Sequence, residues 1–225
     1  DIHLIDNDWK VSTYPLIPGH EVVGTVARMG AEVKHLTIGQ RVGLGWQCGS
    51  CMACEWCERG EEPCCDAHQA TCVGHPGGYA EYVVADSRFV FPIPDTLPSE
   101  AAAPLMCGGI TVYTPLARFT RPAQRVGVIG IGGLGHLALQ FARAMGCEVT
   151  AFSTSPSKEA EAKRLGAHEF VVSTDSQAMA KRAGYFDLLI STVSADLDWP
   201  QWLKLVRKLG RLQIVGASPG NISVP

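Results

Sequence analysis

The sequence predicts an α/β plus β protein in two parts: a β domain over residues 1–118, then a doubly wound parallel sheet with helices over residues 119–225. Before residue 118, short alternating apolar runs are broken by glycine and proline, which is typical of a compact β domain. After it, helices alternate with five apolar strands, which predicts a parallel sheet with helices on both faces. A glycine-rich turn follows the first of these strands.

Each part has its own expected elements. In the first part, strands are expected at EVVGTVARMG (21–30), QRVGLGW (40–46), GGYAEYVVAD (77–86) and RFVFPIP (88–94). In the second, strands are expected over 125–131, 148–154, 169–173, 186–194 and 210–217, and helices over 134–146, 156–166, roughly 175–183 and around 199–208. The helix over 156–166 is opened by Ser155 and Pro156 and ended by Gly166, because proline suits a first helical turn and glycine a helix end.

Composition limits the classes of function. The 225 residues are 46% hydrophobic and 18% charged, which suffices for one large or two ordinary domains with a core. The net charge of −3, without a basic patch, disfavours binding to nucleic acid or to an anionic membrane. No apolar run approaches the roughly 20 residues of a transmembrane helix, and the start has no signal-peptide layout. We therefore expect a cytoplasmic protein with a small-molecule partner, whose clustered cysteines favour metal binding over disulfides.

Six of the nine cysteines lie between residues 48 and 65. Four of them follow the spacing C-x2-C-x2-C-x7-C, at which a tight loop turns four thiolates onto one tetrahedral Zn²⁺: Cys51, Cys54, Cys57 and Cys65. Because sulfur fills all four positions, the predicted site is structural. Disulfides, a redox dithiol and an iron–sulfur cluster remain alternatives, and Cys64 competes with Cys65 for the fourth position.

The run GIGGLG at 130–135 follows an apolar strand and opens an amphipathic helix, the context that a dinucleotide-binding GxGxxG requires. Gly130 allows the tight turn, Gly132 lets the backbone approach a pyrophosphate, and Gly135 lets helix and strand pack closely. The phosphates would lie at the helix N-terminus, facing free N–H groups. The predicted contacts are Gly130, Gly132, Gly133, Leu134 and Gly135.

The end of the next strand determines which dinucleotide is expected. NAD-binding proteins place an acidic residue there against the ribose 2′-hydroxyl, whereas this sequence has FSTSPSK at 152–158. A 2′-phosphate could accept hydrogen bonds from Ser153, Thr154 and Ser155 and pair with the charge of Lys158. NADP(H) is therefore the expected cofactor. The alternative is that these residues only cap the helix at Pro156.

Two isolated segments contain further metal-ligand types. PGHEVVG places His20 and Glu21 at the head of a strand, and PLMCGGITVY places Cys107 at the opening of a helix. An imidazole and a thiolate are zinc ligands that could meet at a cleft. From spacing alone, a satisfied histidine and a small buried thiol are the commoner explanation.

Five segments occur in the same order in the zinc-dependent medium-chain alcohol dehydrogenases: PGHEVVG, the four-cysteine loop, GGYAEYV, LMCGGITVY and GIGGLGH. The chain most closely resembles their cinnamyl-alcohol-dehydrogenase-like branch, which includes NADPH-dependent aldehyde reductases. The resemblance implies a GroES-like catalytic domain followed by a Rossmann-type domain, and it implies that the cysteine loop is a structural zinc lobe with Cys65 as fourth ligand. It also implies a catalytic zinc on His20 and Cys107, with Glu21 close by.

The same resemblance implies roles for single residues. His3 matches the histidine that ends a proton relay, Trp46 matches a position that lines the substrate pocket, and Thr111, Thr192 and Gly216 match positions that line the cofactor cleft. The first catalytic cysteine and a Ser or Thr proton shuttle belong to a CHxD segment whose last residue matches Asp1. We therefore expect an incomplete sheet in a fragment that lacks both ends, inactive by itself, and a homodimer when complete.

The function implied is reversible hydride transfer between NADPH and an aldehyde or primary alcohol, in either physiological direction. The alternative is a non-catalytic nucleotide-binding scaffold or sensor that keeps only the structural zinc. His20 together with Cys107 argues against the scaffold, because a protein that needs only the fold has no use for a second set of metal ligands.

Overall fold

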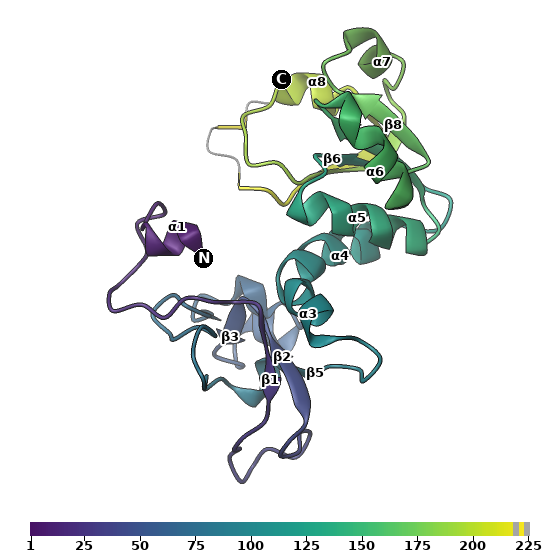
Figure 1. The fold of residues 1–225 in the computed structure, drawn as a ribbon. Coiled ribbons are helices and arrows are strands. Elements are labelled where there is room, and N and C mark those ends of the chain that lie inside the picture. The colour runs from purple at the N-terminus through teal and green to yellow at the C-terminus, as the bar shows by residue number, and fades with distance from the viewer. Residues whose placement is uncertain (218–220, 223–225) are drawn as a thin grey trace. The chain divides into compact units, whose positions relative to one another are not determined.

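The computed structural model describes residues 1–217 and 221–222. It consists of two compact units, Asp1–Cys107 and Gly108–Pro225 (Figure 1). The division precedes the boundary expected near residue 118, because helix α4 (Gly108–Phe119) belongs to the second unit. Val112 and Leu116 of this helix are buried in the core of that unit, and the Tyr113 ring meets the Phe141 ring edge-on at 5.7 Å.

The first unit is built on two small antiparallel sheets. One has the strand order β1-β2-β5, and the other pairs β3 with β4. The strands are β1 (Val22–Thr25), β2 (Arg41–Leu44), β3 (Gln47–Gly49), β4 (Gln69–Ala70) and β5 (Val90–Pro92). Short helices join them: α1 (Ile2–Ile5), α2 (Glu55–Glu58), α3 (Ser99–Ala102) and the 3₁₀ turns Glu62–Cys64, Ser87–Phe89 and Ala103–Met106. Leu44, Cys48 and Phe89 form a buried cluster between these elements.

The strand predicted at 77–86 is wrong. The segment has backbone hydrogen bonds at its two ends: the Gly78 N–H donates to the Gly19 carbonyl at 2.7 Å, the Tyr79 N–H to the Pro18 carbonyl at 2.9 Å, and the Asp86 N–H to the Cys48 carbonyl at 3.3 Å. Between these ends, Tyr82 and Val84 are 76% and 83% exposed. Alternating apolar residues form a strand only beside a partner, and the described part of the chain pairs no strand with residues 80–86.

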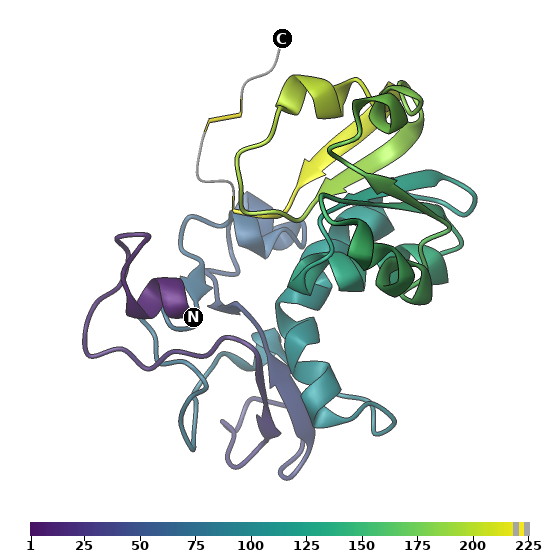
Figure 2. The ribbon, with the colours of Figure 1, turned by 45° about the horizontal axis from the view of Figure 1, so that its top comes forward.

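The second unit contains the predicted parallel sheet, with five strands in the order β10-β9-β6-β7-β8 (Figure 2). The strands are β6 (Arg125–Ile129), β7 (Glu148–Ser153), β8 (Glu169–Val172), β9 (Phe186–Ser191) and β10 (Val206–Ile214). The helices after α4 are α5 (Gly133–Ala144), α6 (Glu159–Arg164), preceded by the 3₁₀ turn Pro156–Lys158, α7 (Ser176–Ala180) and α8 (Trp199–Leu203).

Consecutive residues of β9 show that both faces of this sheet are covered. Leu188 and Ile190 are buried in one cluster with residues of α4, α5 and α6, whereas Leu189 is buried in a second cluster with residues of α7 and α8. Successive side chains of a strand point to opposite faces, so helices pack on both sides. Among the described residues, no helix is long and apolar enough to cross a bilayer.

The helix predicted around 199–208 ends early. Asp198 caps α8, its carboxylate accepting the Gln201 N–H at 3.2 Å, but the helix stops at Leu203 and Val206 already pairs with Phe186 in the sheet. The register then shifts before Arg211, and Leu209 has a φ of 63° and is 99% exposed. Because of this irregularity, the apolar side chains of Val206 and Leu212 pack against the core of the sheet. Their burial stabilises the strand more than the helical sequence pattern of residues 204–208 stabilises a helix.

Candidate functional site

Four cysteine thiols converge at the four-cysteine lobe of the first unit. The Sγ atoms of Cys51 and Cys57 are 3.9 Å apart, those of Cys54 and Cys57 3.6 Å, and those of Cys65 and Cys51 3.5 Å. Ligand sulfurs around a tetrahedral zinc ion, with bonds of about 2.3 Å, lie roughly 3.8 Å apart. The donor set therefore fits Zn²⁺.

Helix α2 positions two of these thiols, because Cys54 lies at its N-cap and Cys57 within its single turn. Cys65 follows the 3₁₀ turn Glu62–Cys64 and is buried, with its thiol inside the cluster. Cys64 is exposed, and its thiol is not part of the four-sulfur group. This geometry favours Cys65 over Cys64 as the fourth ligand.

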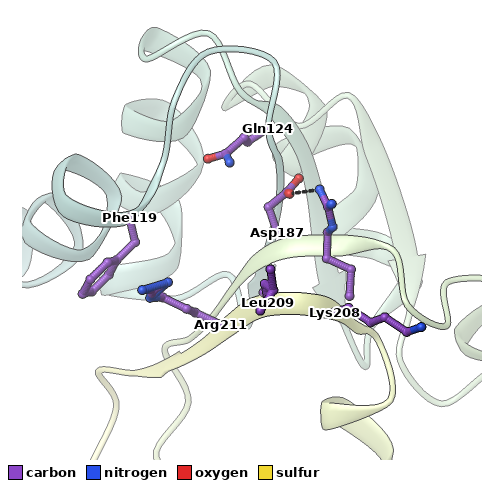
Figure 3. A pocket seen from close by; sticks show the side chains of 8 residues that line it. Phe119, Gln124, Asp187, Lys208, Leu209 and Arg211 are labelled. Carbon is purple, nitrogen blue, oxygen red and sulfur yellow. Dashed lines mark hydrogen bonds and ion pairs between the residues drawn. The ribbon is translucent and has the colours of Figure 1, made fainter.

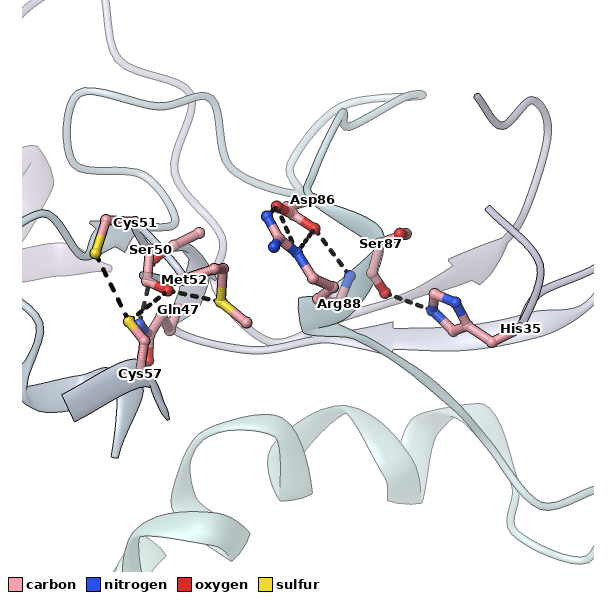
Figure 4. A network of polar contacts seen from close by, with 10 residues as sticks. His35, Gln47, Ser50, Cys51, Met52, Cys57, Asp86, Ser87 and Arg88 are labelled. Atoms are coloured by element: carbon pink, nitrogen blue, oxygen red, sulfur yellow. Dashed lines mark hydrogen bonds and ion pairs between the residues drawn. The ribbon is translucent and has the colours of Figure 1, made fainter. Parts of the chain in front are cut away.

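The thiols of the lobe differ in pKa. Although the Cys57 backbone N–H lowers the pKa of Cys54, desolvation and hydrogen bonds with neighbouring thiols raise it to about 11, whereas hydrogen bonds lower the pKa of Cys51 and Cys57 (Figure 4). The Ser50 hydroxyl lies 3.3 Å from Cys57 Sγ, and this hydrogen bond lowers the pKa of the Cys57 thiol. The backbone N–H of Ala53, followed by neighbouring thiols, lowers the pKa of Cys51 to about 6. Metal ligation requires deprotonated sulfur, so these hydrogen bonds reduce the cost of forming the site.

Replacing Ser50 by alanine is expected to weaken zinc binding at the lobe by about 10-fold to 100-fold, because Cys57 loses its hydroxyl partner. Competition against a chromophoric chelator measures the change. The matched control is Ser87→Ala, which removes a hydroxyl from the neighbouring 3₁₀ turn outside the thiol group. Equal zinc affinity in the two variants would contradict a supporting role for Ser50.

A second group of ligand types forms around His20. The ligand atoms of His20, Glu21 and Cys107 lie within 4.8 Å of one another, although Cys107 is far from the other two in sequence. The Nδ1 atom of His20 lies 3.1 Å from Asp1 Oδ1, which also accepts the Gly19 N–H at 2.8 Å. Burial lowers the pKa of His20, which keeps its imidazole neutral and able to bind a metal. An imidazole, a thiolate and a carboxylate are all ligands that zinc accepts.

The structure places Trp46 beside this group but not His3. The Trp46 ring meets the His20 ring edge-on at 5.4 Å, so the indole forms a wall next to the candidate ligands. His3 instead lies in α1, where its Nδ1 is 2.7 Å from Asp8 Oδ2 and its ring packs on Trp9 at 5.2 Å. Among the described contacts, none joins His3 to His20 or Cys107, so its place in a proton relay rests on the resemblance alone.

The glycine-rich turn joins β6 to α5 in the second unit. Gly130 has a φ of 86°, which glycine adopts without strain, and a Cβ on Gly135 would collide with the Gly130 carbonyl oxygen. At Gly132 and Gly133, a Cβ would meet no atom within 4 Å, so the backbone at the start of α5 is open to a ligand. The Leu134 side chain packs against the core, which leaves only its backbone for a ligand.

Two side-chain oxygens at the carboxyl end of β9 lie near this turn. Thr192 Oγ1 donates to the carbonyls of Ile129 and Gly130, at 2.9 and 3.1 Å, and so fixes the turn. Ser191 Oγ is the buried side-chain oxygen without a hydrogen-bond partner in the described part of the chain, and it lies at the same end of the sheet. An open glycine backbone with an unsatisfied hydroxyl nearby fits the phosphates and ribose of a dinucleotide.

Replacing Gly135 by alanine is expected to destabilise the second unit by about 1–3 kcal/mol and to abolish dinucleotide binding, because helix α5 must move away from the turn. Thermal unfolding and NADPH fluorescence titration measure the two effects. Gly133→Ala is the control, since its Cβ enters open space and the melting temperature should not fall. Unchanged stability of Gly135→Ala would contradict the packing role.

The segment after β7 carries the residues predicted to bind a 2′-phosphate. Ser153 ends β7, and its hydroxyl accepts the Ser155 N–H at 3.2 Å. Ser155 does not cap the helix with its side chain, which instead pairs with Ser157 Oγ at 2.8 Å. Lys158 Nζ lies 2.6 Å from Glu161 Oε2. Sequence analysis did not predict this acidic partner of Lys158, which lies one helical turn away. Thr154 is exposed, so its hydroxyl is accessible to a ligand.

The remaining cofactor candidates come from two other elements. Gly216 follows β10, where its N–H donates to the Ser191 carbonyl at 3.2 Å, and a Cβ there would collide with the Val193 carbonyl. Close backbone approach at this point therefore requires glycine. Thr111 is half-buried in α4, and the structure adds no contact that specifies its role.

A pocket of about 210 Å³ lies at the opposite end of the second unit, at the amino ends of β6 and β9 (Figure 3). Two of its three cationic side chains have partners within the described part of the chain: Arg207 Nη1 lies 2.6 Å from Asp187 Oδ1, and the Arg211 guanidinium packs on the Phe119 ring at 4.8 Å. Because parallel sheets bind ligands at the carboxyl ends of their strands, this pocket is separate from the cofactor residues.

Comparison with known families covers both units. Residues 1–95 match the family described as an alcohol dehydrogenase GroES-like domain, and residues 133–225 match the family described as a zinc-binding dehydrogenase. Among curated proteins, the chain is 48% identical over 217 residues to an aldehyde reductase, AdhA, of Synechocystis sp.. That alignment covers 96% of this chain and 65% of the relative.

Solved structures agree with these matches. A cinnamyl alcohol dehydrogenase from Sorghum bicolor is 40% identical with a TM-score of 0.94, covering 100% of this chain and 67% of that one. A cinnamyl alcohol dehydrogenase from Helicobacter pylori, complexed with NADP(H), is 36% identical with a TM-score of 0.87, covering 97% and 65%. The chain thus spans about two thirds of the length of the relatives that it matches.

Proposed function

The chain belongs to the zinc-dependent medium-chain alcohol dehydrogenases, and on this basis we propose that the whole protein transfers a hydride reversibly between NADPH and an aldehyde or primary alcohol. The observation that carries the proposal is the convergence of His20, Glu21 and Cys107, which provides metal ligands beyond those of the four-thiol lobe. A scaffold that needed only the structural zinc would have no use for this second group.

The residues of the first unit have separable tasks in this reaction. A zinc ion at the second group would supply a Lewis acid for the substrate oxygen, and NADPH would supply the hydride. Asp1 accepts a hydrogen bond at His20 Nδ1, which fixes the ring and leaves Nε2 for the metal. Trp46, edge-on to His20, offers an apolar surface for flat or extended aldehydes.

The residues of the second unit would bind the cofactor. The open backbone of Gly132 and Gly133 receives the pyrophosphate at the start of α5, where free N–H groups face it. The segment 153–158 contains no acidic residue, so a 2′-phosphate meets hydroxyls and Lys158 rather than a carboxylate. The solved relative from Helicobacter pylori, which is complexed with NADP(H), supports the same cofactor.

The cofactor preference is tested on the full-length enzyme with Lys158→Ala. The ratio of kcat/KM for NADPH to that for NADH is expected to fall about 10-fold or more, because the 2′-phosphate loses a charge-assisted hydrogen bond. Ser153→Asp should lower the ratio further by repulsion. Glu161→Gln should raise it, since it frees Lys158 from its ion pair.

Lys163→Ala is the matched control for that experiment. Lys163 also lies in α6, but its Nζ donates to the His168 carbonyl, so the NADPH to NADH ratio should not change. A wild-type enzyme that uses both cofactors equally would contradict the NADPH assignment. An aldehyde panel run with each cofactor, together with a zinc count per subunit, tests the activity itself: two zinc ions support the enzyme and one supports the scaffold.

A further inference from the structure

A third group of metal-ligand types lies behind the His20 ring and includes a cysteine outside the four-cysteine loop. The ligand atoms of Asp1, His20 and Cys72 all lie within 4.8 Å of one another. Cys72 is completely buried, and its Sγ is 3.9 Å from Asp1 Oδ1. Asp1 and His20 are partly exposed, at 19% and 16% of their side chains, so an ion can reach the group from their side.

The distances in this group match those around a metal ion. Around a tetrahedral ion with bonds of about 2.0 Å to O or N and about 2.3 Å to S, an oxygen and a nitrogen lie roughly 3.3 Å apart, and an oxygen and a sulfur roughly 3.5 Å. The corresponding distances from Asp1 Oδ1 are 3.1 Å to His20 Nδ1 and 3.9 Å to Cys72 Sγ. The third distance, between a ligand nitrogen of His20 and Cys72 Sγ, is at most 4.8 Å.

The backbone holds Cys72 in this position in a strained conformation. Cys72 has a φ of 63°, in the left-handed region that residues with a side chain rarely adopt. The preceding residue is anchored, since the Thr71 N–H donates to the Trp46 carbonyl at 2.6 Å and Thr71 Oγ1 to the Gly45 carbonyl at 2.7 Å. The thiol is therefore directed at Asp1 by a rigid segment, as a ligand is in a preorganised site.

The Oδ1 atom of Asp1 lies within hydrogen-bond distance of several groups at once. Asp1 Oδ1 faces the Gly19 N–H, His20 Nδ1 and Cys72 Sγ, and the Tyr79 hydroxyl lies 3.3 Å from Oδ2. The Cys72 thiol donates to this negatively charged oxygen, and His20 Nδ1 donates to it when the ring carries its proton there. A cation can replace both protons. A divalent ion that replaced both protons would keep the Gly19 contact.

We propose that Asp1, His20 and Cys72 form a binding site for one thiophilic divalent cation, of which Cd²⁺ and Zn²⁺ are the representatives. On binding, the S–H bond of Cys72 breaks, a sulfur–metal bond forms and the proton goes to solvent. The His20 proton moves from Nδ1 to Nε2, so that Nδ1 binds the ion, and Asp1 gives a carboxylate oxygen. No electron is transferred in this step.

An ion bound at this site would inhibit the proposed hydride transfer, and this inference rests on the proposed function. A His20 ring that binds an ion through Nδ1 carries its proton on Nε2, which then cannot serve the group with Glu21 and Cys107. The two groups therefore compete for one imidazole. Excess thiophilic metal would inhibit hydride transfer through Cys72, whereas the metal site itself does not depend on the activity.

The experiment counts bound Cd²⁺ on metal-free, reduced full-length protein in which Cys107 and the cysteine of the CHxD segment before Asp1 are both replaced by serine. This background leaves the competing group without a thiolate. Equilibrium dialysis gives the stoichiometry, and the ¹¹³Cd resonance separates a site with one sulfur from the four-thiolate lobe. Adding Cys72→Ser is expected to remove one Cd²⁺ per chain and the one-sulfur resonance. Adding Cys147→Ser, which replaces another buried thiol outside any ligand group, is expected to remove neither.

The same Cd²⁺ count with Cys72→Ser as with Cys147→Ser would overturn the proposal. If circular dichroism shows that Cys72→Ser is unfolded, Asp1→Asn in the same background decides instead, with an expected loss of Cd²⁺ affinity of about 10-fold or more. Unchanged affinity there would also overturn it. Failure of the proposed function is visible separately, as unimpaired aldehyde reduction by the Cys107→Ser single variant, and leaves the Cd²⁺ count unaffected.

Discussion

Replacing Cys54 by serine is expected to remove one zinc ion per chain and to lower the melting temperature of the first unit by about 10 °C. Zinc binding by four-thiolate loops provides about 10–16 kcal/mol of folding free energy, so losing one of four ligands costs roughly 3 kcal/mol or more. Cys54 Sγ lies 3.6 Å from Cys57 Sγ within the group, so its replacement leaves three thiols, which hold zinc too weakly to keep it bound. Calorimetry and metal analysis of the same sample measure both effects.

The matched control for this prediction is Cys64→Ser. Cys64 lies in the same loop, next to Cys65, but it is exposed and outside the four-sulfur group. Its replacement should leave zinc content and melting temperature unchanged. If Cys54→Ser kept its full zinc content and Cys64→Ser lost it, the assignment of the ligands would be wrong.

Replacing Cys107 by serine in the full-length enzyme is expected to lower kcat/KM for aldehyde reduction by about 1000-fold or more, which corresponds to about 4 kcal/mol. Serine is a poor ligand for zinc at neutral pH, so the group with His20 and Glu21 would lose the thiolate of Cys107. The four-thiol lobe is separate, so the melting temperature should change far less than in Cys54→Ser.

Cys147→Ser provides the control for activity. Cys147 is buried, and its thiol lies 3.7 Å from the Arg121 carbonyl, outside any group of metal ligands. Turnover should stay close to that of the unmutated enzyme. A Cys107→Ser variant with full zinc content and undiminished turnover would remove the basis of the proposed catalytic site and favour the scaffold alternative.

The second unit could be predicted from sequence because its signals are local. The central strands, such as Arg125–Ile129, are buried apolar runs, and the helical periodicity between strands marks the helices. The turn at Gly130 is likewise contained in six consecutive residues. Parallel pairing with helices on both faces then follows from the alternation of strands and helices, whereas the strand order comes from the structure.

The errors came from features that depend on distant residues. The run 77–86 alternates like a strand but has no paired neighbour among the described residues, and the run 204–208 is helical in pattern but is drawn into the sheet by Val206. The group of Asp1, His20 and Cys72 gave no signal, because nothing in an isolated cysteine indicates which side chain folds against it. Long-range contacts of this kind are absent from any local window.

The position of the division, between Cys107 and Gly108, has a consequence for how such a protein could diverge. Every candidate metal ligand and Trp46 belong to the first unit, whereas every candidate cofactor residue belongs to the second. Substitutions at 153–158 that exchange one nicotinamide cofactor for another would then be selected without disturbing zinc chemistry. Changes around Trp46 could in turn adapt the protein to new aldehydes while the nucleotide half stays constant. Cofactor preference and substrate preference could therefore change independently, through substitutions in different units of the chain.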